Sequence, residues 1–205
     1  MGQVSRRQLL AGLALVGAGS VVGCSSGGAA RGDNTVYVVD SLTAADSDPV
    51  ALRFGATSWA AHLDPKLTVV GARTEDGAST EALAEGVTRS DAHTLVVLSG
   101  AHDVGRVAFE RTAYFIEEIV KTVRSQRVLL CTLPPRDPRP DLHVQFNQNL
   151  ALLAKDKGWM LCDPSPALSV GVLWAPGMSD DGLHPTVAGA TTIGQELSRC
   201  LLDPQ

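Results

Sequence analysis

The sequence predicts an α/β protein: a three-layer α/β/α sandwich of the flavodoxin-like kind, with a five-stranded parallel sheet. Short apolar runs alternate along the chain with longer segments of helical periodicity. These runs are continuous, as in strands that are covered on both faces. Strands that alternate with helices favour a parallel sheet with a helix layer on each side.

The individual elements follow from local signals. Apolar and β-branched runs, bounded by turn-forming residues, predict strands over residues 35–39, 67–70, 94–98, 127–131 and 159–162. Apolar residues at helical spacing, together with start and stop signals, predict helices over residues 50–63, 80–86, 107–123, 142–155 and 187–202. The clearest helix is 107–123, in which Ile116, Ile119, Val120 and Val123 recur at i, i+3, i+4 and i+7.

Composition limits the possible functions. The chain has 205 residues, which fits one domain once an export signal is removed. Its net charge of -5 argues against a nucleic-acid partner, which would need a basic face. No Cys or His cluster has zinc spacing, so we expect no metal and no cofactor. Besides Cys24 there are Cys131, Cys162 and Cys200, an odd number from which the sequence selects no disulfide pair.

The N-terminal segment predicts export and a lipid anchor. Arg6-Arg7 precedes an apolar run over residues 9–22 that is too short for an ordinary membrane span. The start of this segment resembles a twin-arginine export motif, and the residues that end at Cys24 resemble a bacterial lipobox. We therefore expect a signal peptide over 1–23, a lipidated Cys24 with a tether over 24–34, and a folded domain over 35–205 on the extracytoplasmic face of the cell membrane. The alternative is a plain signal peptide with an incidental cysteine.

Polar residues gather where the predicted strands end. In such sheets, ligands bind beyond the carboxyl ends of the strands. The residues at these positions are Asp40-Ser41-Leu42, Gly71, Gly100-Ala101-His102-Asp103 and, after the last strand and a loop, Asp181-Gly182-Leu183-His184-Pro185. Topology alone therefore points to these four segments.

Ser41, His184 and Asp181 offer the chemistry of a catalytic triad. A serine hydroxyl needs an adjacent base, and an imidazole can take its proton and return it to the leaving group. A carboxylate must hold that imidazole in the correct tautomer, and a tight loop can bring Asp181 to a histidine three residues later. Asp180 could replace Asp181. Taken singly, Ser41 could be a turn residue and His184 a loop residue before the last helix.

The four segments, in this order, resemble the conserved blocks of the SGNH (GDSL-type) hydrolase family. The resemblance extends over residues 36–202, and Leu133-Pro134-Pro135-Arg136 also fits it. It implies the fold given above and a serine hydrolase that acts on ester bonds. By this resemblance Ser41, Asp181 and His184 are catalytic, and the oxyanion hole consists of the backbone N–H groups of Ser41 and Gly71 and the side chain of His102.

Two residues depart from the family pattern. Val39 stands where a glycine usually precedes Asp-Ser, and His102 stands where the family has an asparagine. Imidazole can still donate one N–H, but it is bulkier than a carboxamide, which affects geometry and substrate choice.

We expect an esterase that cleaves an acylated lipid, an acylated glycan or a small ester through an acyl-Ser41 intermediate. The membrane is a further partner through Cys24. One alternative is a catalytically impaired envelope lipoprotein that binds glycan or lipid, and another is an acyltransferase of the same fold. The segment 171–179, with Trp174, either shapes the pocket or is an ordinary surface loop.

Overall fold

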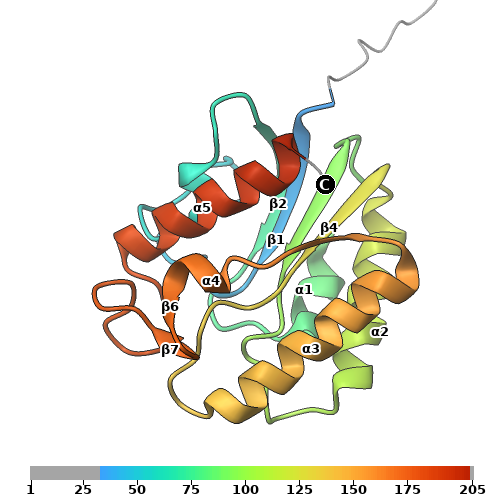
Figure 1. The fold of residues 1–205 in the computed structure, drawn as a ribbon. Coiled ribbons are helices and arrows are strands. Elements are labelled where there is room, and N and C mark those ends of the chain that lie inside the picture. The colour runs from blue at the N-terminus through green and yellow to red at the C-terminus, as the bar shows by residue number, and fades with distance from the viewer. Residues whose placement is uncertain (1–32, 204–205) are drawn as a thin grey trace, which may run out of the picture. The chain divides into compact units, whose positions relative to one another are not determined.

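The computed structural model describes residues 33–203, which contain one five-stranded parallel sheet (Figure 1). The strand order is β2-β1-β3-β4-β5, and all four pairings are parallel. The strands are β1 (Thr35–Asp40), β2 (Thr68–Thr74), β3 (Thr94–Leu98), β4 (Arg127–Cys131) and β5 (Met160–Cys162). The predicted sheet is confirmed. The predicted signal peptide, Cys24 and residues 24–32 of the tether lie outside the described residues.

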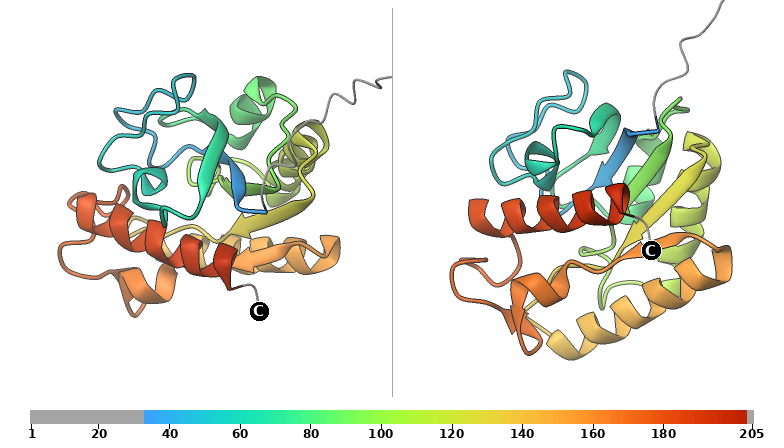
Figure 2. Two further views of the ribbon diagram at one scale, coloured as in Figure 1. Left: turned by 90° about the horizontal axis from the view of Figure 1, so that it is seen from above. Right: turned by 45° about the horizontal axis from the view of Figure 1, so that its top comes forward.

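Helices cover both faces of this sheet, as Figures 1 and 2 show. On one face, α2 (Phe109–Val123) packs between α1 (Thr80–Gly86) and α3 (Pro140–Lys157). On the other face, α5 (Val187–Leu202) packs against a short 3₁₀ helix, η1 (Trp59–His62). The predicted three-layer α/β/α arrangement is therefore confirmed.

The predicted helix over 50–63 is wrong. Turns occupy most of this segment, and only η1 at its end is helical. Asp48 pairs with Arg53 in an isolated bridge, and Leu52 has a positive φ of 52°, which an α-helix does not tolerate. The segment is nevertheless anchored, because the Trp59 side chain is fully buried. The segment between β1 and β2 is therefore anchored to the core by burial of this indole and not by the apolar face of a helix.

The second strand is longer than predicted, and this moves Gly71. Strand β2 continues to Thr74, so Gly71 lies inside it and pairs with Tyr37 of β1 at an irregularity in the register. A Cβ atom at Gly71 would lie 2.6 Å from the Tyr37 ring. The glycine therefore makes room for a buried aromatic ring and does not form the turn after the strand.

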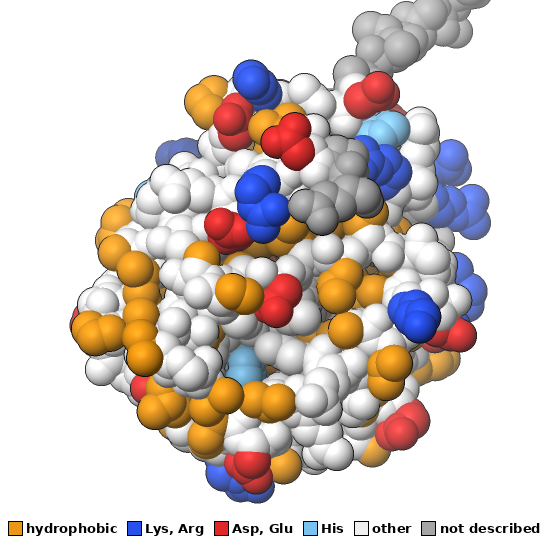
Figure 3. Space-filling model, in the orientation of Figure 1, with side chains coloured by type: hydrophobic (Ala, Val, Ile, Leu, Met, Phe, Trp, Pro, Cys, Tyr) orange, Lys and Arg blue, Asp and Glu red, His pale blue; other side chains and the backbone are white. Residues whose placement is uncertain are grey.

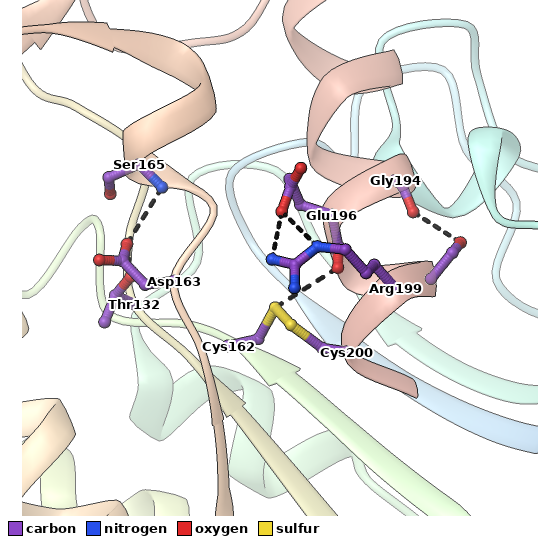
Figure 4. Close-up of a disulfide and its surroundings, with 9 residues drawn as sticks. Thr132, Cys162, Asp163, Ser165, Gly194, Glu196, Arg199 and Cys200 are labelled. Atoms are coloured by element: carbon purple, nitrogen blue, oxygen red, sulfur yellow. Dashed lines mark hydrogen bonds and ion pairs between the residues drawn. A yellow bond between two sulfur atoms is a disulfide. The ribbon is translucent and has the colours of Figure 1, made fainter. Parts of the chain in front are cut away.

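A disulfide joins the last helix to the last strand of the sheet. Cys162 of β5 is bonded to Cys200 of α5 (Figure 4), which settles the pairing that the sequence left open. Cys131 is a free, buried thiol, and burial raises its pKa. Helix α5 also approaches η1 closely at Gly194. A Cβ atom at this position would lie 2.7 Å from the Trp59 carbonyl oxygen, so only a glycine fits here.

The segment after β5 contains elements that the sequence did not predict. They are α4 (Ser165–Leu168) and an antiparallel hairpin of β6 (Ser169–Val170) and β7 (Leu173–Trp174). Trp174 is buried, whereas Val170, Val172 and Leu173 are exposed. Hydrophobic side chains gather on this side of the molecule in Figure 3. No helix within residues 33–203 has the length and apolarity that crossing a bilayer requires.

Candidate active site

Asp181 and His184 form a hydrogen-bonded pair on the loop before α5. His184 Nδ1 lies 2.7 Å from Asp181 Oδ2, and the backbone N–H of His184 donates to Asp181 Oδ1 at 2.7 Å. The N–H of Leu183 donates to the same oxygen at 2.8 Å. Partial burial by itself would raise the pKa of Asp181, but these hydrogen bonds outweigh it and hold the pKa well below its usual range. The carboxylate therefore stays ionised and orients the imidazole.

The loop that carries this pair is itself fixed by Ser179. Its hydroxyl donates to the His184 carbonyl at 2.7 Å and accepts the N–H of Gly182 at 3.0 Å. Gly182 has a φ of 73°, so it supplies the left-handed turn that brings Asp181 back to His184. Both side chains of the pair remain partly exposed. The imidazole edge that does not face Asp181 is thus free to meet a reactant.

Ser41 lies in the turn that directly follows β1. The carboxylate of Asp40 holds this turn by accepting the backbone N–H groups of Leu42, at 2.9 Å, and Thr43, at 3.2 Å. The Thr43 hydroxyl donates to the same carboxylate. Burial raises the pKa of Asp40 to about 6, against the opposing effect of these hydrogen bonds. Asp40 is thus a turn-forming residue whose significance the sequence pattern alone did not reveal.

The Ser41 side chain is fully buried, and its Oγ has no hydrogen-bond partner. In this conformation no hydrogen bond joins it to His184. A buried hydroxyl without a partner is unusual, because most such groups are satisfied within the protein. Ser41 Oγ can therefore still form a hydrogen bond to another group.

His102 connects Ser41 to His184. It follows β3, its ring centroid lies 6.4 Å from that of His184, and its ring lies beside the Ser41 backbone. Its Nε2 is buried without a partner. Burial lowers the pKa of His102, and the neighbouring His184 lowers it further, which favours the neutral form of the ring. The next residue, Asp103, is a structural acceptor for the N–H of Thr80 and the hydroxyl of Thr112.

Gly71 is not at this site. In the sheet register Asp40 pairs with Thr74, so the prediction that Gly71 follows β2 beside Ser41 is wrong. The glycine next to Ser41 is Gly77, whose N–H donates to the Ser41 carbonyl at 3.2 Å and whose φ is 73°. The sequence signal for Gly77 was present, since it lies in a turn-like Glu-Asp-Gly run, but the early end predicted for the strand concealed it.

A loop between β4 and α3 borders the His102 segment and the Asp181–His184 loop, and the sequence did not place it in the candidate site. The N–H of Asp137 donates to the Gly182 carbonyl at 2.9 Å, and its carboxylate accepts the N–H of Trp174 at 3.0 Å. Arg136 Nη1 donates to the Ala101 carbonyl at 2.6 Å, directly before His102. The segment with Trp174 therefore supports the Asp181–His184 loop through Asp137.

A separate cleft of about 320 Å³ opens between α3 and the β6–β7 hairpin. Ser169, Gly171 and Val172 are among its lining residues, and so is His143 of α3, whose pKa burial lowers to about 4. Neither Ser41 nor His184 contributes to this cleft, so it is distinct from the candidate active site. Within residues 33–203, no three side chains of the His, Cys, Asp and Glu types group as metal ligands.

The arrangement can support acyl transfer. It combines a hydroxyl without a partner, an imidazole oriented by an ionised carboxylate, and a second imidazole beside the Ser41 backbone whose pKa is lowered. These are the components that a nucleophile, a base and an oxyanion site require.

Known proteins share this fold and these segments. The model of the GDSL-like lipase/acylhydrolase family matches residues 40–191. A structure described as a G-D-S-L family lipolytic protein, from Desulfitobacterium hafniense, has a TM-score of 0.66 at 17% identity, over 81% of this chain and 98% of that one. The acetylxylan esterase from Geobacillus stearothermophilus has a TM-score of 0.63 at 18% identity, over 82% and 93% of the two chains. No curated protein sequence matches the chain.

The family match covers most of the folded domain, and the similar structures have the same α/β architecture. On these grounds, the chain belongs to the GDSL-like lipase/acylhydrolase family, the SGNH hydrolases that its sequence resembles.

Proposed function

We propose that this chain is a serine esterase that works through a covalent acyl-Ser41 intermediate. The observation that carries the proposal is the hydrogen bond of 2.7 Å between His184 Nδ1 and Asp181, because it leaves Nε2 of the same ring as a proton acceptor. Ser41, which follows β1 with its hydroxyl unengaged, is the nucleophile that this base would serve.

The reaction proceeds in two steps. Ser41 Oγ attacks the carbonyl carbon of the ester while His184 takes the hydroxyl proton, and His184 then returns this proton to the departing alcohol oxygen. Water next attacks the acyl carbon while His184 takes its proton, and His184 returns this proton to Ser41 Oγ as the carboxylic acid is released. Ionised Asp181 stabilises the imidazolium that forms in each step.

The oxyanion would be stabilised by the backbone N–H of Ser41 and the ring of His102. The buried Nε2 of His102 has no partner in the structure, and in the neutral tautomer that carries its proton on this nitrogen it would donate to the oxyanion. Gly71 takes no part, because it lies within β2.

Acylated glycans, acylated lipids and small esters are the proposed substrates. The similar acetylxylan esterase favours a short acyl group on a carbohydrate, and its serine-to-alanine and aspartate-to-alanine variants are each described as catalytic mutants. Both residue types are present here as Ser41 and Asp181.

The Ser41→Ala variant tests the mechanism. We expect it to lose hydrolysis of p-nitrophenyl acetate by roughly a million-fold and to lose labelling by a fluorophosphonate probe. Ser58→Ala is a matched control, because Ser58 is equally buried and its Oγ also lacks a partner. Full activity in folded Ser41→Ala, or a label that maps to another residue, would contradict the assignment.

A non-catalytic binding function is the alternative that one observation favours, namely that Ser41 is fully buried and not bonded to His184. The same experiment separates the two functions. A binding protein would take no fluorophosphonate label in its wild-type form, whereas an esterase would.

We also propose that the protein is exported and anchored through a lipid on Cys24. The disulfide between Cys162 and Cys200 supports an oxidising compartment outside the cytoplasm. Cys24→Ala should move the protein from the membrane fraction to the soluble fraction or leave its signal uncleaved. Mass spectrometry of the mature N-terminus would contradict the anchor if it found an unmodified residue other than Cys24.

A further inference from the structure

Three arginines gather beside the candidate active site. Arg106 lies in the loop after β3, and Arg136 and Arg139 lie in the loop between β4 and α3. Burial lowers the pKa of Arg136, and the charges of Arg106 and Arg139 lower it further. The charges of Arg106 and Arg139 thus both act on Arg136, and Arg139 Nη2 lies 3.9 Å from the position of a Cβ atom built at Gly105, the residue before Arg106.

None of these arginines has an ion pair with a carboxylate in residues 33–203. Two acids of the site have other partners: Asp137 accepts the N–H of Trp174, and Asp181 binds His184. Arg136 Nε is buried and has no hydrogen-bond partner at all. A partly buried guanidinium such as that of Arg136 is costly unless it is paired, whereas Arg106 and Arg139 are exposed and accessible to an external anion.

The arginine cluster, Arg106, Arg136 and Arg139, borders the reacting groups. Arg136 Nη1 donates to the Ala101 carbonyl at 2.6 Å, next to His102. The charges of Arg106 and Arg136 both act on His102, to lower its pKa further than burial and His184 do. One small substrate could therefore place an anionic group at the arginine cluster and its ester at Ser41 and His184.

We propose that the substrate carries an anionic group, a carboxylate or a phosphate, that the arginine cluster binds while the ester lies at Ser41 and His184. Guanidinium groups match both anions in shape, since their parallel N–H groups can donate to two oxygens at once. The ester part of this statement rests on the proposed function, whereas binding of the anion can be measured without turnover.

Kinetics on three acetyl esters tests the proposal. The compounds are methyl p-acetoxybenzoate, which is neutral, p-acetoxybenzoate, which carries a carboxylate, and p-acetoxyphenyl phosphate. The wild type should prefer at least one anion over the neutral ester in kcat/KM, and the better anion identifies the chemistry. Arg106→Gln and Arg139→Gln should each lower the ratio of anionic to neutral kcat/KM by roughly ten- to a hundredfold. Arg89→Gln, an exposed arginine without an ion pair, removes the same charge elsewhere and should leave the ratio unchanged.

A binding experiment keeps the two proposals separable. Calorimetry with the Ser41→Ala protein should give tighter binding of the preferred anion than of the neutral ester, and Arg106→Gln in this background should abolish the difference. Equal wild-type kcat/KM for all three esters would overturn the anion site and leave the esterase intact. If no ester were cleaved, the proposed esterase function would be wrong. Calorimetry would still decide the anion site, because equal affinities for the anionic and neutral esters would overturn it.

Discussion

Asp40 gives the stability of this protein a pH dependence that one substitution can expose. Its carboxylate is completely buried at the end of β1, where it accepts the N–H groups of Leu42 and Thr43 and holds the Ser41 turn. Burial raises its pKa from the ordinary value of 3.8 to about 6, although the hydrogen bonds oppose the rise. Asp40→Asn keeps the shape of the side chain and removes the titration.

The size and sign of the effect follow from the two pKa values of Asp40. The folded protein holds the proton more tightly than the unfolded chain, so the stability from this group is fully present below about pH 4 and is lost as pH rises toward 6. Each pKa unit corresponds to about 1.4 kcal/mol, so the total loss is about 3 kcal/mol and is complete near pH 7. The Asn variant lacks this loss.

Urea unfolding of both proteins between about pH 4 and pH 7, followed by circular dichroism, measures the effect. The free energy of unfolding of the wild type minus that of Asp40→Asn should fall by most of the 3 kcal/mol over this range. Other acids with shifted pKa values, such as Asp181, are present in both proteins and cancel in the difference. A difference that is constant with pH would refute the inference that Asp40 is a buried acid with a raised pKa.

Two further predictions concern the loop that carries His184, the candidate catalytic base, and the disulfide at the far end of α5. Gly182→Ala should lower kcat roughly ten- to a hundredfold, because its φ is 73° and its Cβ atom would lie 2.9 Å from the Asp137 Cβ atom. The control is Gly171→Ala, since Gly171 has a φ of 65° but its Cβ atom would meet nothing within 4 Å. Equal kcat values for the two variants would contradict the prediction. Replacing Cys162 and Cys200 by alanine should lower the free energy of unfolding by about 3–4 kcal/mol, because the disulfide closes a span of 38 residues. Urea unfolding measures this change, and an unchanged unfolding midpoint would show that the disulfide contributes nothing to stability.

The sheet could be predicted because its strands are buried on both faces. Strands β3 and β4 lie over the predicted residues 94–98 and 127–131, since continuous apolar runs between turn residues have few alternatives. Helix α5 likewise matches residues 187–202. The short pieces were not predicted, because the two-residue strands of the β6–β7 hairpin are below the length at which a period can be recognised.

Errors at the candidate site came from tertiary effects. Gly71 was taken as a strand end because glycine usually interrupts a strand, but here the Tyr37 ring requires it within one. The helix predicted over 50–63 failed because burial of Trp59 and turns around Asp48 outweigh weak helical periodicity. The arginine cluster comes from two separate loops, and only the folded chain brings them together.

The disulfide at Cys200 also has a consequence for engineering. Helix α5 is attached covalently to β5 at its last turn, while its first turn is capped by Thr186, two residues after His184. The candidate base His184 therefore precedes a helix that the disulfide fixes at its far end, in addition to the support that its loop receives through Asp137 and Trp174. Hairpins of other lengths and sequences can therefore be grafted between Ser169 and Trp174 to reshape the cleft beside α3, provided that the Asp137 contact to the Trp174 backbone is kept.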